Sequence, residues 1–138
     1  MAEGEVLLEQ DIVTMADGVP KKITVKKEMG SDDMSRQMGL EGVPLLKVYA
    51  DFASTQNIED IWPKDFDAAI KSGEEKTMVR NLCGAYKPGD KDHWAAVYIV
   101  KGEPWKLVIE VQAPGEELVT METEVPPEIS DIKKAYTK

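Results

Sequence analysis

The sequence of 138 residues contains one cysteine, Cys83, and one histidine, His93. A single cysteine excludes an intramolecular disulfide framework and is typical of proteins from a reducing compartment. One cysteine and one histidine are also too few for a structural zinc site of the usual composition within one chain. No phosphate-binding glycine loop, metalloprotease helix motif or nucleophile elbow is present. The sequence therefore predicts no metal and no cofactor. The alternative is an oxygen-only site for magnesium or calcium, since acidic residues abound, although no twelve-residue calcium loop is present.

Long apolar runs are missing as well. No segment approaches the roughly 20 apolar residues of a transmembrane helix. The N-terminus, Met1 to Glu5, is acidic, whereas a signal peptide begins with basic residues. Together with the lone cysteine, these absences predict a cytoplasmic protein with no membrane partner.

Positive charge is in deficit, because 26 acidic side chains outnumber 17 basic ones and give a formal net charge of −9. Nucleic-acid binding depends largely on neutralising phosphates with basic side chains. The one dense basic cluster consists of Lys21, Lys22, Lys26 and Lys27, and we interpret it as the turn and solvated face of a strand. We therefore expect no nucleic-acid partner.

The remaining composition is that of an ordinary globular protein, with 42% hydrophobic and 31% charged residues. A chain of this length suits one hydrophobic core. Repeats, low-complexity tracts and interdomain linkers are absent from the sequence. We expect a single globular domain over residues 1–138.

The N-terminal segment predicts a β-hairpin. Residues 5–15 form an apolar strand, and residues 17–20 supply a turn that begins with Asp-Gly. Residues 22–26 then alternate, with Ile23 and Val25 facing inward and the polar side chains facing water.

The middle of the chain predicts a short helix over residues 31–39, a strand over 45–53 and a longer helix up to about Ser72. In the strand, alternation favours an outward position for Asp51, although an inward carboxylate with partners is the alternative. Pro63 either kinks the longer helix or begins a second one. A core-facing stripe at helical spacing is formed by Ile58, Trp62, Phe66 and Ile70.

The C-terminal half predicts further strands over residues 77–86, 93–100, 105–112 and 118–125. The last three have short connections and indicate an antiparallel meander. A terminal helix is expected over residues 127–136. The order of elements predicts an α+β fold: a largely antiparallel sheet of about six strands with two or three helices packed on it.

Two residues are weak catalytic candidates. His93 is the one side chain whose ordinary pKa lies near neutrality, so a general acid–base step would use it first. Asp90 has the strand parity to accompany it but lies in the preceding turn. The alternative is that His93 begins a strand and bonds to a backbone carbonyl or to water. Cys83 lies among apolar neighbours, which indicates a buried and unreactive thiol.

Strand parity also predicts a ligand-binding group. Trp94 and Tyr98 share one face of their strand, and Glu110 on the next strand completes a set with aromatic walls and one orienting carboxylate. The neighbouring small residues Ala95 and Ala96 either leave room for a ligand or accommodate a packed helix.

No family motif is recognised, and three functional hypotheses follow from the residues. The first is a non-catalytic acidic interaction or regulatory module: an accessory subunit, or an inhibitor of a partner protein. The second is a small-molecule-binding domain whose pocket, near Trp94, Tyr98 and Glu110, takes an apolar or aromatic ligand. The third is a small enzyme that uses His93 as an acid or base. The scarcity of catalytic residues disfavours the enzyme, and a homodimer is among the assemblies that the sequence allows.

Overall fold

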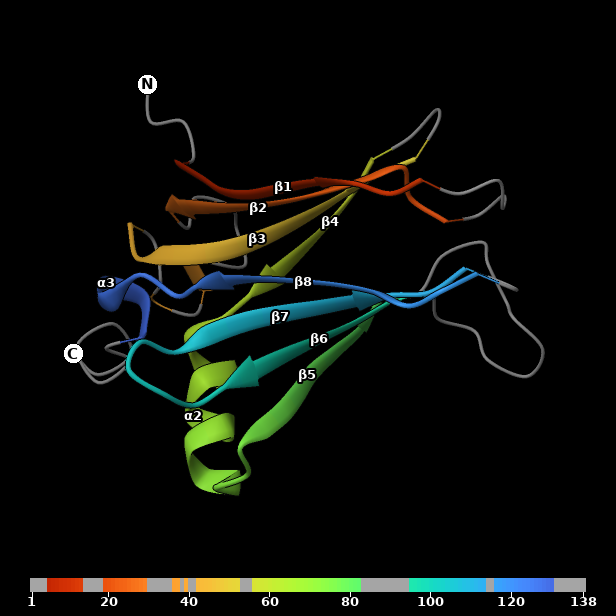
Figure 1. Cartoon of the computed structure of the whole chain (residues 1–138). Helices are drawn as coiled ribbons and strands as arrows, with labels where there is room; N and C mark the ends of the chain where they lie inside the picture. The colour runs from red at the N-terminus through yellow and green to blue at the C-terminus, as the bar shows by residue number, and fades with distance from the viewer. Residues whose placement is uncertain are drawn as a thin grey trace.

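The chain forms two four-stranded antiparallel sheets with a shared core between them (Figure 1). This computed structural model describes residues 5–13, 19–29, 36–37, 39, 42–52, 56–82, 95–113 and 116–130. The first sheet contains β1 (Glu5–Asp11), β2 (Lys22–Met29), β3 (Pro44–Asp51) and β4 (Gln56–Ile61). Helix α2 (Pro63–Ser72) leads to the second sheet, which contains β5 (Lys76–Leu82), β6 (Ala95–Val100), β7 (Lys106–Val111) and β8 (Val119–Glu124). The short α3 (Pro127–Ser130) follows β8.

The predicted α+β fold with a single six-stranded sheet is wrong. The described residues form two separate meanders, and α2 is their one helix of more than four residues. The N-terminal hairpin and the C-terminal meander are both present, but they belong to different sheets. The expected helix over 31–39 and the end of the expected terminal helix lie largely outside the described residues. None of the described helices is long and apolar enough to cross a membrane.

The strand missing from the sequence-based prediction is β4, which occupies the first part of the expected long helix. Pro63 explains the difference, because it lacks an N–H donor and disfavours a helical residue before it. Trp62 is accordingly extended, with φ −91° and ψ 158°, and the helix begins only at Pro63. The predicted stripe is therefore split: Trp62 and Phe66 are buried, whereas Ile58 and Ile70 are 51% and 41% exposed.

Helix α2 is closed at both ends by polar contacts. The Trp62 N–H donates to the Asp65 carboxylate at 2.7 Å, which satisfies a donor at the N-terminus. At the other end Gly73 has a φ of 71°, and its N–H donates to the Ala69 carbonyl at 3.2 Å. Phe66 then packs edge to face on Trp105, with ring centroids 6.4 Å apart, and so attaches α2 to the second sheet.

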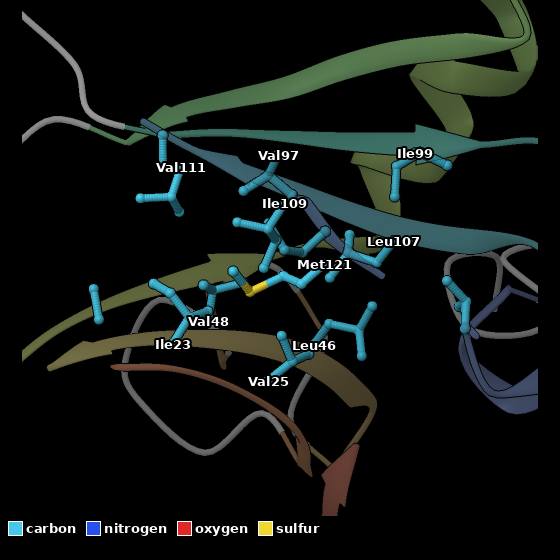
Figure 2. Packing of buried hydrophobic residues seen from close by; sticks show 14 of the residues in the cluster. Ile23, Val25, Leu46, Val48, Val97, Ile99, Leu107, Ile109, Val111 and Met121 are labelled. Carbon is cyan, nitrogen blue, oxygen red and sulfur yellow. The ribbon is translucent and has the colours of Figure 1, made fainter. Parts of the chain in front are cut away.

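The inner faces of the two sheets form a common core. Ile23 and Val48 of the first sheet, and Val97 and Ile109 of the second, are at most 1% exposed. All belong to a cluster of buried residues drawn from both sheets, and Figure 2 shows their side chains pointing into the space between the sheets. Apolar burial contributes roughly 25 cal/mol per Å². This shared core fills the inside with apolar side chains and leaves the polar residues on the outer faces.

The first strand of each sheet carries an irregularity. The register shifts between Val6 and Leu8 in β1, and between Met78 and Arg80 in β5. At the edge of the first sheet β1 also approaches β8, where the Thr123 hydroxyl donates to the Leu7 carbonyl at 3.4 Å. The two sheets are thus linked through a side chain at this edge as well as through the core.

Candidate functional site

The outer face of the first sheet carries the side chains that alternate with its buried ones. We call this surface the β1–β4 outer face. The strand register arranges it in three rows: Asp11, Lys22, Asp51 and Gln56; Glu9, Thr24, Tyr49 and Ile58; and Val6, Lys26, Lys47 and Asp60.

A shallow hollow of about 290 Å³ lies on the β1–β4 outer face. Its lining comes from all three rows: Val6, Glu9, Thr24, Lys26, Tyr49, Asp51 and Gln56. Thr24 occupies the middle row between the longer side chains of Glu9 and Tyr49. The hollow follows from this difference in side-chain length.

Thr24 is the buried polar group of the hollow. Its β-branched side chain suits a strand, and it is only 7% exposed. The Thr24 hydroxyl has no hydrogen-bond partner among the residues that the structure describes. A buried polar group without a partner costs about 1–3 kcal/mol. Because Thr24 lines the hollow, a polar group that enters the hollow is placed to supply the missing hydrogen bond.

Lys26 is the second polar group of the hollow that lacks a partner of its own kind among the described residues. Its ammonium lies 5.1 Å from the centroid of the Tyr49 ring, a distance at which a cation is attracted by the ring face. The other lysines of this face are ion-paired: Lys22 with Glu9 at 2.6 Å and Lys47 with Asp60 at 3.0 Å. Lys26 makes no such pair within the described part of the chain. Its charge is therefore available to an anionic group.

The ion pair beside the hollow keeps its members charged. The hydrogen bond from Lys22 holds the pKa of the Glu9 carboxyl below its ordinary value, and the same contact raises the pKa of the Lys22 ammonium. Lys26 adds a smaller effect that also lowers the pKa of Glu9. Both groups therefore stay ionised around neutral pH.

Tyr49 forms one wall of the hollow and is fixed by its hydroxyl. The hydroxyl donates to a carboxylate oxygen of Glu28 at 2.6 Å. Burial raises the pKa of Tyr49 well above its ordinary value, and the hydrogen bond to Glu28 raises it further. On the adjacent row the Gln56 amide donates to the Asp51 carboxylate at 2.6 Å. The second carboxylate oxygen of Asp51 and the carbonyl oxygen of Gln56 remain as acceptors at the hollow.

The residues of the predicted ligand-binding group are only partly described. Tyr98 and Glu110 do share the outer face of the second sheet, as parity predicted, and Lys76 of β5 contacts both. The Lys76 ammonium lies 4.0 Å from the Tyr98 ring centroid and 2.7 Å from a Glu110 oxygen. The remaining candidates lie outside the described residues: Cys83, Asp90, His93 and Trp94. A pocket beside Trp94 and an acid–base role of His93 remain predictions.

Sequence reasoning missed the hollow although it placed part of the lining correctly. Alternation correctly placed Thr24, Lys26 and Asp51 on the outer face. The prediction that Thr24 faces water is wrong, because the longer side chains around it leave it only 7% exposed. The available signal for the hollow was the short side chain of Thr24 between the long side chains of Lys22 and Lys26 on one strand face. What was missing was the register that brings Glu9 and Tyr49 to either side of Thr24, since neither lies near it in sequence.

Comparison with known proteins gives no relative: no family model, curated protein or solved structure matches the chain. Within the described part of the chain, no group of three or more His, Cys, Asp or Glu side chains is arranged to hold a metal ion. The geometry of the β1–β4 outer face is therefore the guide to function.

Proposed function

We propose that this protein is a non-catalytic binding module that recognises its ligand or partner through the hollow on the β1–β4 outer face. One observation carries the proposal. The hydroxyl of the buried Thr24 and the ammonium of Lys26 line the same hollow, and neither has a hydrogen-bond or ion-pair partner among the described residues. Isolated buried polar groups are costly in a folded protein, and binding of a ligand offsets that cost.

The packing of the core supports a surface site. The inner faces of both sheets are occupied by buried apolar side chains such as Ile23 and Ile109 (Figure 2). An interior site would require removal of this core, whereas the outer face already offers polar groups and an aromatic wall.

The titration behaviour of the face supports binding over acid–base chemistry. An efficient general acid or base has a pKa near the working pH. The shifts on this face go the other way, because the pKa of Glu9 is lowered and the pKa values of Lys22 and Tyr49 are raised. These groups are suited to presenting fixed charges and dipoles to a bound molecule. The acidic net charge of −9 adds long-range attraction for a basic partner, as expected of a regulatory or accessory module.

The test is a chemical-shift screen of the isotope-labelled full chain. The protein is titrated with mixtures of small carboxylates, amines, zwitterions, neutral aromatics and short charged peptides. We expect saturable shifts of the Thr24, Lys26 and Tyr49 amides, and none at Tyr98 and Val108 on the other outer face. Shifts confined to the second sheet, or none with any mixture, would overturn the proposal.

A further inference from the structure

The hollow presents charges of both signs. Lys26 lies on one side of Thr24 along β2, and Asp51 lies on the opposite side in the row through Lys22. Successive residues on one face of a strand are about 7 Å apart, so each charged row is about that distance from the Thr24 row. Glu9 adds a second carboxylate beside Thr24, one oxygen of which is paired with Lys22 at 2.6 Å. A positive and a negative region therefore border a buried hydroxyl.

This arrangement disfavours ligands of a single charge. A simple anion attracted by Lys26 meets the carboxylates of Glu9 and Asp51. A simple cation attracted by those carboxylates meets Lys26, which already occupies the approach to the Tyr49 ring. Like charges at close range cost free energy, whereas a molecule with both charges is attracted at both ends.

We propose that the hollow binds a small zwitterion of the α-amino-acid class. The ligand carboxylate accepts hydrogen bonds from the Lys26 ammonium and the Thr24 hydroxyl. The ligand ammonium donates to the free oxygen of Asp51 and to the Gln56 carbonyl oxygen. This inference rests on the proposed binding function and names the ligand of the same site.

The size and remaining lining of the hollow agree with such a ligand. A volume of about 290 Å³ lies just below the usual range for ligand pockets, which suits a ligand as small as an amino acid. Val6, which is 51% exposed, and the Tyr49 ring supply apolar surface beyond the two charged ends. An amino acid with an aliphatic side chain places its apolar part there and gains affinity from burial.

The experiment compares four probes with the full-length protein by calorimetry and by amide chemical shifts. Leucine and glycine carry both charges, leucinamide lacks the carboxylate, and N-acetylleucine lacks the ammonium. We expect leucine to bind about tenfold more tightly than glycine because its side chain is buried. The two blocked derivatives should each bind at least about tenfold more weakly than leucine, since each loses one charged contact.

Three variants locate the binding. Lys26→Met removes the charge while keeping side-chain length, and Thr24→Val removes the hydroxyl while keeping shape. Each should weaken leucine binding, by about tenfold or more and by several-fold respectively. Lys106→Met is the matched control, because Lys106 lies on the outer face of the second sheet, where it pairs with Glu122 at 3.3 Å. That variant should bind leucine with unchanged affinity.

The outcomes separate this inference from the proposed function. The zwitterion proposal is overturned if N-acetylleucine or leucinamide binds as tightly as leucine. It is also overturned if Lys26→Met binds leucine with unchanged affinity. Absence of binding by both leucine and glycine also overturns it. In any of these cases, ligands of another class that shift the Thr24 and Lys26 amides leave the binding function intact. Thermal unfolding of each variant shows that altered affinity does not come from misfolding.

Discussion

The outer faces of the two sheets use the same aromatic contact in different ways. On the first, the Lys26 ammonium lies over Tyr49 and has no ion-pair partner in the described part of the chain. On the second, the Lys76 ammonium lies over Tyr98 and is also bonded to Glu110 at 2.7 Å. The lysine above the tyrosine is thus also ion-paired on the second face, whereas on the first face it has no ion-pair partner among the described residues.

The central residues of the two outer faces also differ in polarity. The middle of the first face holds the short polar Thr24, beneath a hollow. The corresponding region of the second face holds Val108 opposite Tyr98, and Val108 is 9% exposed and has no polar side-chain atom. On the second face the lysine is paired and the central residue is apolar, whereas the first face holds a hydroxyl and an ammonium without polar partners among the described residues. This contrast supports the proposal that the β1–β4 outer face is the binding surface.

The largest test asks whether the two sheets are separate units or halves of one core. Ile23→Ala in the first sheet and Ile109→Ala in the second each truncate a side chain that is 0% exposed. Each should lower the free energy of unfolding by about 3 kcal/mol. Urea unfolding followed by circular dichroism and by tryptophan fluorescence should give one coincident transition for both variants. Two resolved transitions would mean that the sheets unfold independently, contrary to the shared core.

The second test exchanges the central residues of the two faces. Thr24→Val removes a hydroxyl that has no partner among the described residues and should raise the free energy of unfolding by about 1 kcal/mol. Val108→Thr introduces such a hydroxyl and should lower it by about 1–2 kcal/mol. Chemical denaturation measures both. A destabilised Thr24→Val protein would show that the Thr24 hydroxyl is already satisfied.

The third test compares the two lysines above the tyrosine rings. Lys76→Met breaks the pair with Glu110 and should cost about 0.5 kcal/mol, because this pair is partly exposed and screened by water. Lys26→Met also loses a ring contact but breaks no ion pair with a described residue, so it should be destabilised less than Lys76→Met. A thermal-melting series at low and high salt checks this difference, which should shrink as the salt concentration rises.

The smallest effect concerns Tyr49 at alkaline pH. In the unfolded chain Tyr49 loses its proton near its ordinary pKa of 10.0, but in the folded protein burial and Glu28 keep it protonated. The contribution of Tyr49 to stability is therefore complete below pH 10.0 and is lost as the pH rises through the raised folded-state value. Tyr49→Phe should flatten this alkaline decline in the pH profile of unfolding. In an ultraviolet absorbance titration, Glu28→Gln should let Tyr49 ionise at lower pH.

Local patterns in the sequence predicted most of the strands but not their grouping into sheets. Alternation over 22–26 and the short turns of the C-terminal half identify strands correctly. The i, i+4 spacing from Ile58 to Phe66 is typical of a helix, but these residues span the end of β4, Pro63 and the start of α2. Because β4 completes the first meander, assigning its residues to a helix concealed the division of the strands into two sheets.

The candidate site was predictable only in part for a related reason. Parity correctly placed Tyr98 and Glu110 on one face, but it contains no information on a long side chain such as Lys76 reaching them from β5. For the hollow, parity placed Thr24 and Lys26 outward. Its depth and charge depend on the pairing of β2 with both β1 and β3, which a single sequence does not specify.

The register shifts in β1 and β5 have a consequence for how the molecules behave at high concentration. Both strands lie at the edge of their sheet, where unpaired backbone groups invite a strand from another molecule. A bulge interrupts the regular spacing of those groups and increases the local twist, so an incoming strand finds no continuous ladder. These two irregularities disfavour the addition of a strand from another molecule at β1 and at β5.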